Sequence, residues 1–296
     1  MNPAPIILFV YNRPSHTAMT LQALSNNVLA DRSVLYIYSD GPRVNASAEE
    51  LKSIMDVRRV IREKKWCREV IIIEREHNAG LANSVKKGVG EVLGKSESVI
   101  VLEDDLVTSK GFLSYMNECL VAYHDSANVW SVTGHMFPLN YSSVKCALLP
   151  YISTWGWATW AGRWRDFEKA ATRDTSTILK SQALSALFNL ADYDYTAILK
   201  NNYQSSWGIQ WYFHVFINHG LSVYPTKSLV RNIGMDGTGT HYKESVAGPF
   251  EELASEIRVS KSSTIDLEFW SAYLDFFRKK KTMRYQILKN VFPGDR

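Results

Sequence analysis

Three adjacent carboxylates, Glu103-Asp104-Asp105, are the residues of this sequence best suited to chemistry. They follow an apolar run at 99–102 that is typical of a buried strand. Neighbouring carboxylates repel one another unless a positive charge compensates them. Because carboxylate oxygens are ligands that Mg²⁺ and Mn²⁺ prefer, we expect one of these ions here. Such an ion could bridge the phosphates of a nucleotide and stabilise a departing diphosphate.

A solvated acidic turn would also account for the triplet, and two rival chemistries use carboxylates after a strand. A haloacid-type phosphatase would need an aspartate where this chain has Glu103. A sugar-nucleotide pyrophosphorylase would need a glycine-rich phosphate loop after the first strand, where the chain reads Tyr11-Asn-Arg-Pro14. The sequence also contains neither a P-loop nor a Gly-x-Gly-x-x-Gly motif. These observations favour phosphates held by a metal over phosphates held by a backbone cradle.

Two further polar sites follow predicted strands and should lie near the triplet. Apolar runs predict strands at 5–11, 34–38, 70–73, 99–102 and 129–132. Helical spacing and capping residues predict helices between them: at 15–28, from Ser47, from the Asn78–Ser84 motif through Leu93, and from Ser109. This alternation predicts an α/β fold with a parallel sheet, whose ligands bind beyond the carboxyl ends of the strands. Asp40 and Asn78 follow the second and third strands, so they should share one crevice with the triplet.

The sequence pattern changes after about residue 136. Six of the nine tryptophans lie between Trp155 and Trp211, and this part predicts loops and short helices, above all at 155–160. Residues 250–288 predict a helical segment. Five of its apolar residues recur at helical spacing and form one predicted stripe: Leu267, Trp270, Tyr273, Leu274 and Phe277.

Several short motifs, in this order, resemble the donor half of GT-A glycosyltransferases. They are Asn12-Arg13-Pro14, Ser39-Asp40-Gly41, Asn78-x-Gly-Leu-Ala-x-Ser84 and Val99-Ile-Val-Leu-Glu-Asp-Asp-Leu106 with Phe112. The sequence is most similar to N-acetylglucosaminyltransferase I and related bacterial sugar transferases. The likeness continues through Trp130-Ser-Val-Thr-Gly134, Gly156-Trp157, Pro225, Asn232 and Gly239-Thr-His241, and covers roughly residues 5–243.

The resemblance implies a GT-A-type, Rossmann-like sheet and a role for each matching residue. Asp105 would bind the metal, Asp104 would face the ribose or the metal's waters, and Glu103 would hydrogen-bond the donor sugar. Asp40 would contact the uracil or ribose of a UDP-sugar, and Arg13 would approach its phosphate or sugar. His241 would lie near the metal or the diphosphate. The same motifs assign donor binding to Asn78, Gly80 and Ser84.

The sequence carries weaker signals for the acceptor-binding residues and for the catalytic base. Aromatic faces stack on sugar rings, so we expect Trp157 and Trp207 at the acceptor, although core packing explains tryptophans equally well. Relatives place an aspartate beside a tryptophan where this chain has Gly208 and Ile209. We therefore assign the base to Asp236, which a plain Asp-Gly turn would also explain. Asp192 and Asp194 are weaker candidates for this role.

Composition limits the classes of partner. The net charge is +4, with nine basic and four acidic residues from 258 to 296, so the excess of positive charge lies at one end. Nucleic-acid binders usually spread basic residues along a reading face, so we expect no nucleic-acid partner. The basic end could contact an anionic membrane face instead. The three cysteines form no Cys-x-x-Cys motif, and no segment predicts a signal peptide or a membrane span, so we expect a cytoplasmic protein.

These inferences together predict a metal-dependent hexosyl- or N-acetylhexosaminyltransferase that uses a UDP-sugar. The resemblance implies a growing bacterial surface glycan as acceptor, free or lipid-linked. It divides the chain into a donor half at 1–135, an acceptor half of the same GT-A domain at 136–245 and a helical basic segment at 246–296. The alternative, motivated by Gly208, is a nucleotide-sugar-binding protein that has lost catalysis.

Overall fold

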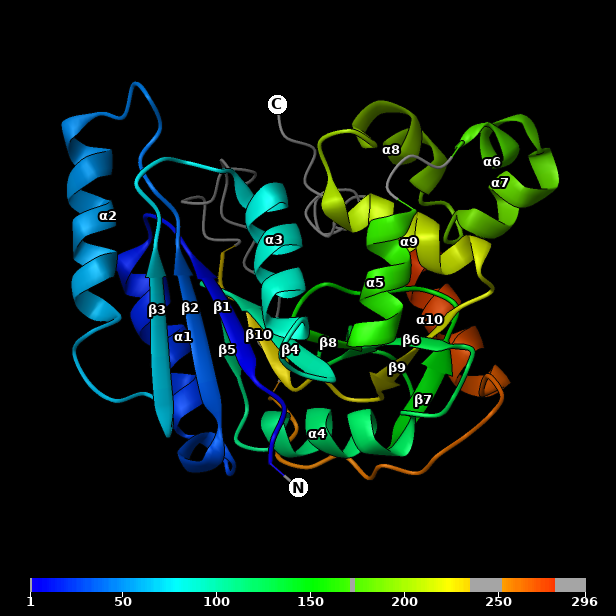
Figure 1. Cartoon of the computed structure of the whole chain (residues 1–296). Coiled ribbons are helices and arrows are strands. Elements are labelled where there is room, and N and C mark those ends of the chain that lie inside the picture. The colour runs from blue at the N-terminus through cyan, green and yellow to red at the C-terminus, as the bar shows by residue number, and fades with distance from the viewer. Residues whose placement is uncertain (1, 171–173, 235–251, 280–296) are drawn as a thin grey trace.

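The computed structural model describes residues 2–170, 174–234 and 252–279 (Figure 1). Its centre is an eight-stranded sheet with the order β3-β2-β1-β4-β8-β6-β9-β7. Four of the strand pairings in this sheet are parallel and three are antiparallel. The sheet is therefore mostly parallel, and the predicted α/β class is confirmed.

The four strands of the first half are parallel and adjacent. They are β1 (Ile6–Val10), β2 (Val34–Ser39), β3 (Glu69–Glu74) and β4 (Ser98–Glu103). Both β1 and the apolar part of β4 are buried, which explains why each reads as a continuous apolar run. These strands agree with the predicted ones, so the polar residues that follow them lie at one edge of the sheet.

The second half of the sheet differs from the prediction. It consists of β6 (Val129–Thr133), β7 (Cys146–Leu149), β8 (Trp157–Trp160) and β9 (Leu221–Pro225). The predicted loops and short helices at 155–160 were wrong, because β8 lies antiparallel between β4 and β6. The two neighbouring strands satisfy the backbone of β8, and this pairing has no signature in its local sequence.

Helices flank the sheet. The larger ones are α1 (Pro14–Ser25), α2 (Ala48–Val60), α3 (Leu81–Leu93), α4 (Phe112–Ala122), α5 (Ala161–Lys169) and α9 (Trp207–Ile217). Helix α3 packs on β1 and β4, and α4 packs on β6 and β8. Figure 1 shows α3 and α5 side by side on the viewer's side of the sheet. Besides the C-terminal helix, the described part contains four short helices: η1 (Ala30–Arg32), α6 (Ser176–Lys180), α7 (Gln182–Phe188) and α8 (Tyr195–Asn202).

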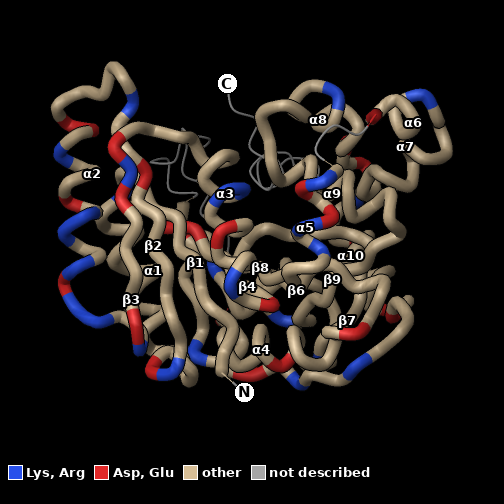
Figure 2. Tube along the Cα trace, in the orientation of Figure 1, with Lys and Arg blue, Asp and Glu red and all other residues tan. Residues whose placement is uncertain are grey.

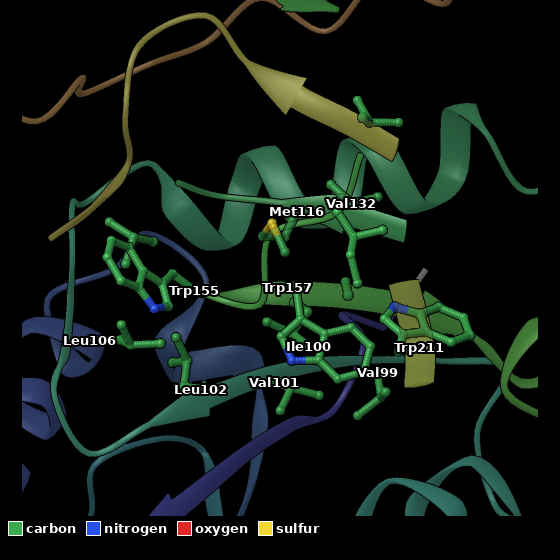
Figure 3. Packing of buried hydrophobic residues seen from close by; sticks show 14 of the residues in the cluster. Val99, Ile100, Val101, Leu102, Leu106, Met116, Val132, Trp155, Trp157 and Trp211 are labelled. Atoms are coloured by element: carbon green, nitrogen blue, oxygen red, sulfur yellow. The ribbon is translucent and has the colours of Figure 1, made fainter. Parts of the chain in front are cut away.

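Aromatic residues fill the core around β4 and β8 (Figure 3). Trp157 lies over β4 in this view, with Trp211 of α9 beside it. The ring centroids of Trp164 and Trp211 are 5.5 Å apart, and those of Trp130 and Trp211 are 6.2 Å apart. Tryptophans that are distant in sequence thus join the two halves of the sheet through one core.

The C-terminal helix is shorter than predicted. Helix α10 spans Leu267–Lys279, whereas residues 252–266 are not helical. Their backbone instead bonds to other elements: Cys146 donates to the carbonyl of Arg258 and Ala254 donates to that of Ser228. Because these distant groups satisfy the segment, its local helical pattern does not decide its structure.

The stripe of α10 also differs from the predicted one at its first residue. Phe269, Tyr273 and Phe277 are buried, whereas Leu267 is 76% exposed. The helix packs on the main domain, where the ring centroids of Phe277 and Phe137 lie 5.2 Å apart. The basic residues 280–296 lie outside the described residues. No helix in the described part of the chain is long and apolar enough to span a bilayer.

This burial pattern predicts opposite outcomes for two neighbouring substitutions on α10. Phe269→Ala removes a fully buried ring and should lower the free energy of unfolding by about 3–5 kcal/mol. Leu267→Ala is the control and should change it by less than about 0.5 kcal/mol, because that side chain is exposed. Urea denaturation of both variants measures the difference. Equal losses in both would contradict the assigned face of the helix.

Candidate active site

The site begins at the paired ends of β1 and β4. Phe9 and Glu103 are partners in the register of these two strands, so the residues after them leave the sheet side by side. Asp104 and Asp105 form the turn from β4 into the short strand β5 (Leu106–Thr108). Arg13 lies before Pro14, the first residue of α1. The structure therefore brings Arg13 to Glu103, Asp104 and Asp105, which we call the acidic cluster.

Arg13 supplies the positive charge that the acidic cluster requires. Its Nη2 donates to Asp105 Oδ2 at 3.0 Å and also to Asp104 Oδ1. Helix α1 holds this arrangement in place, because Thr20 Oγ1 donates to the carbonyl of Asp104 at 2.8 Å and Thr17 N donates to that of Arg13 at 2.9 Å. The sequence predicted Arg13 at the phosphate or sugar, but not its ion pairs with the two aspartates.

Burial and crowding shift the acidity of the cluster. Burial, with the charges of Asp105 and Asp104, raises the pKa of Glu103 to about 8, although Arg13 opposes the shift. Burial also raises the pKa of Asp104, while Arg13 lowers it. Burial would lower the pKa of Arg13, but the two aspartates outweigh it and raise that pKa. Arg13 therefore stays charged, and the raised pKa of Glu103 favours its protonated form at neutral pH.

A second chain segment reaches the cluster through a two-stranded ribbon. Strand β10 (Val230–Asn232) pairs antiparallel with β5, and Ile233 N donates to the carbonyl of Asp105 at 2.9 Å. Gly234 follows so closely that a Cβ there would overlap Asp105 Oδ2 and contact Arg13 Nη1. A larger residue there would force the side chains of Asp105 and Arg13 to shift. Asp236 and His241, the predicted base and second metal ligand, lie outside the described residues.

Sequence reasoning did not identify Gly234 or His16 as site residues. His16 is buried on α1, close enough to Asp104 to lower the pKa of that carboxyl. Residues 13, 16, 17 and 20 are spaced as one helix face, and this signal could have identified His16. Gly234 carried no local signal, because its close approach depends on the pairing of β10 with β5.

The predicted donor-binding residues on β2 and α3 lie in a second group beside the cluster. Asp40 accepts from the backbone amides of Gly41, Ala79 and Gly80 at 2.9–3.2 Å. Asn78 Nδ2 donates to the carbonyl of Gly41 at 3.0 Å. These bonds fasten the loop before α3 to the end of β2, so Asp40 positions the loop. Ser84 follows on α3, where its Oγ accepts from Arg75 at 2.8 Å. The contacts of all these residues with a sugar nucleotide stay predictions.

The predicted acceptor residues are part of the core in this structure. Trp157 is 1% exposed and Trp207 is 5% exposed, and their rings stack with centroids 5.3 Å apart. Gly208 is buried one residue into α9, so that helix carries no carboxylate at this position. Asp194 caps α8 by accepting from Ala197 N at 2.9 Å, and Asp192 precedes it in the same loop. Acceptor binding by the two tryptophans stays a prediction.

Within the described part of the chain, the acidic cluster needs further ligands to hold a metal ion. Among the described residues, no three His, Cys, Asp or Glu side chains are grouped so that they could hold a metal ion alone. Asp104 and Asp105 offer hard oxygen ligands, and each gives one oxygen to Arg13. Mg²⁺ is commonly bound by one or two carboxylates plus substrate phosphates, so the residues present fit an ion that a diphosphate helps to hold.

No protein-family model and no curated protein matches this chain. Among solved structures it is similar to S. aureus TarS, with 11% identity and a TM-score of 0.39. The match covers 78% of this chain and 37% of that chain. A likeness at this level identifies no activity, and the geometry of the acidic cluster carries the functional conclusion.

Removal of Arg13 should destabilise the protein, because the buried Asp104 and the partly buried Asp105 would lose their compensating charge. With metal chelated, Arg13→Gln should lower the free energy of unfolding by about 3 kcal/mol. Arg59→Gln is the control, since its 2.7 Å pair with Asp56 is largely exposed and should contribute less than about 1 kcal/mol. Adding Asp104→Asn to Arg13→Gln should restore part of the loss. A stability loss no larger than that of the control would contradict the pairing.

The raised pKa of Glu103 predicts a pH-dependent stability. Between its ordinary pKa of 4.5 and the folded value of about 8, the folded protein binds more protons than the unfolded chain. Stability therefore falls as pH rises through this window. Metal-free Glu103→Gln should melt above the parent at pH 9 and close to it at pH 5. The exposed Glu49→Gln should follow the parent at both values. Equal melting of parent and Glu103→Gln at pH 9 would show that Glu103 is not perturbed.

Proposed function

We propose that this protein is a glycosyltransferase of the GT-A type that transfers a sugar from a UDP-sugar to a hydroxyl of a glycan acceptor. The observation that carries the proposal is the acidic cluster with Arg13 at the carboxyl ends of β1 and β4. In open α/β sheets this edge is where ligands bind. The loop that Asp40 fastens lies at the same edge, beyond β2, and would face the nucleoside.

A divalent cation, Mn²⁺ or Mg²⁺, would be held by Asp105 with Asp104 beside it. When bound, it would supply Lewis-acid stabilisation of the charge on the departing diphosphate. Arg13 would bind the phosphates from the other side. It uses Nη2 for the two aspartates, and none of its other N–H groups has a partner among the described residues. A guanidinium donates well to phosphate oxygens, so one side chain can orient both the carboxylates and the leaving group.

Protonated Glu103 would donate a hydrogen bond to the donor sugar. Its position at the last residue of β4 fixes it on a buried strand, so it can orient the sugar without reorganisation. The general base would be Asp236, which follows Gly234 by two positions, and Gly234 lies against Asp105. A carboxylate in that role would remove the proton of the acceptor hydroxyl as it attacks.

The second candidate function is a nucleotide-sugar-binding protein without transfer activity. It is favoured by α9, in which Gly208 is buried and no carboxylate faces the site at that position. The two functions share the acidic cluster and differ in turnover. Metal-dependent release of UDP from a panel of UDP-sugars supports the transferase, and UDP binding without any release supports the binding protein.

If Asp105 binds the metal, replacing its carboxylate with an amide should have a large effect on UDP binding. Asp105→Asn should abolish calorimetric UDP binding in the presence of Mn²⁺ and leave the circular dichroism spectrum unchanged, because the carboxylate is a ligand at the rim of the fold. Asp125→Asn is the matched control, since that side chain is 89% exposed on another loop. Unchanged UDP affinity in Asp105→Asn would overturn the role of the acidic cluster in nucleotide binding.

A further inference from the structure

Helices α3 and α5 are neighbours in Figure 1. Residues of both helices line a pocket outside the acidic cluster. Its volume is about 490 Å³, which is within the range of small-molecule sites. All but one of the residues that line it are polar or charged: Arg75, Ala79, Asn83, Lys86, Lys87 and Glu168. The first five come from the donor half and Glu168 comes from α5, so the pocket lies where the two halves of the chain meet.

Helix α3 divides its residues between the sheet and this pocket. Val85, Val89 and Val92 are buried against the core, whereas Asn83, Lys86 and Lys87 lie on the other side of the helix. Figure 2 marks the basic positions on α3 and the acidic and basic positions on the neighbouring α5. Gly90 lets the helices approach, because a Cβ there would meet the carboxylate of Glu168. The pocket is thus built by packed helices.

The lining carries more positive than negative charge, and two of its cations lack an acidic partner. Among the described residues no carboxylate pairs with Lys86 or Arg75, and Lys87 is 3.9 Å from Glu91. Lys86 is partly buried, and burial lowers its pKa. Arg75 is held in place, since Nη1 donates to Ser84 Oγ at 2.8 Å and its guanidinium lies 5.9 Å from the centre of the Tyr38 ring. Oriented cations without a counter-charge favour an anionic ligand.

The pocket shares no residue with the acidic cluster. It is joined to the proposed active site through Ala79, whose amide donates to Asp40 at 2.9 Å. At the ends of β1 and β4, Arg13 and a metal ion would already compensate the negative charge of a diphosphate. The cations between α3 and α5 are therefore available for a second anion, and the pocket is large enough for a sugar that carries it.

We propose that this pocket binds an anionic group of the saccharide acceptor, a phosphate or a carboxylate. Arg75 and Lys86 would bind the anion, while Asn83 and Glu168 would face the sugar hydroxyls. The substrate class is then a negatively charged glycan. This inference rests on the proposed function, because it names the acceptor of the same reaction.

Calorimetry with model saccharides tests the pocket on the full chain. Glucose 6-phosphate represents the phosphate and glucuronate the carboxylate, and glucose is the neutral control. At least one charged sugar should bind, and Lys86→Gln or Arg75→Gln should each weaken it about tenfold. Lys95→Gln should leave the affinity unchanged, since Lys95 is exposed beyond the other end of α3. Glu168→Gln should strengthen binding about threefold, because it removes a negative charge from the lining.

A competition with UDP separates this inference from the proposed function. The charged sugar and UDP with Mn²⁺ should bind together. If UDP binds but neither charged sugar does, or if the Lys86 and Lys95 variants bind the sugar equally, the pocket is not an anion site. If UDP displaces the sugar, the pocket belongs to the donor and the acceptor assignment is wrong. If UDP with Mn²⁺ does not bind at all, the proposed function fails, whatever the sugars show.

Discussion

The need to compensate three neighbouring carboxylates shapes the edge of this sheet. Parallel pairing of β1 with β4 places Glu103 beside the end of β1, and the turn that follows adds Asp104 and Asp105. Charges held this close in a partly buried place require a cation. Arg13 provides it from the first turn of α1, and Thr20 ties the same helix to the turn. The start of α1, the end of β4 and the β5–β10 ribbon therefore form one structural unit.

A consequence of this arrangement is that the same residues compensate charge in the free protein and would bind substrate. Arg13 and the two aspartates compensate one another's charge through their hydrogen bonds, so the site is stable without a ligand. A diphosphate and its metal would add both signs of charge at once. They could redistribute the contacts of Arg13 without leaving any group uncompensated. Charged groups that are already in place at the site can stabilise the charge that develops on a leaving group.

The second half of the chain supports this edge through aromatic packing. Insertion of β8 beside β4 buries Trp157 over the strand that carries the acidic cluster, and α9 adds Trp207 and Trp211 to the same core. These tryptophans therefore belong to the core that packs against the strand carrying the acidic cluster. The polar surface between the halves is instead found at α3 and α5, where Lys86 and Glu168 face the pocket.

The sequence by itself determined the parallel strands, the helices between them and the place of Glu103–Asp105. These features follow from local patterns: apolar runs, helical spacing, and polar residues directly after strands. Only the tertiary structure decided that Arg13 pairs with aspartates 91 and 92 positions away, that β8 is a strand, and that residues 252–266 are not helical. It also decided that Trp157 and Trp207 are buried. Each of these depends on partners distant in sequence that satisfy charges, backbone groups or apolar surface, and no local pattern records which partner a residue will meet.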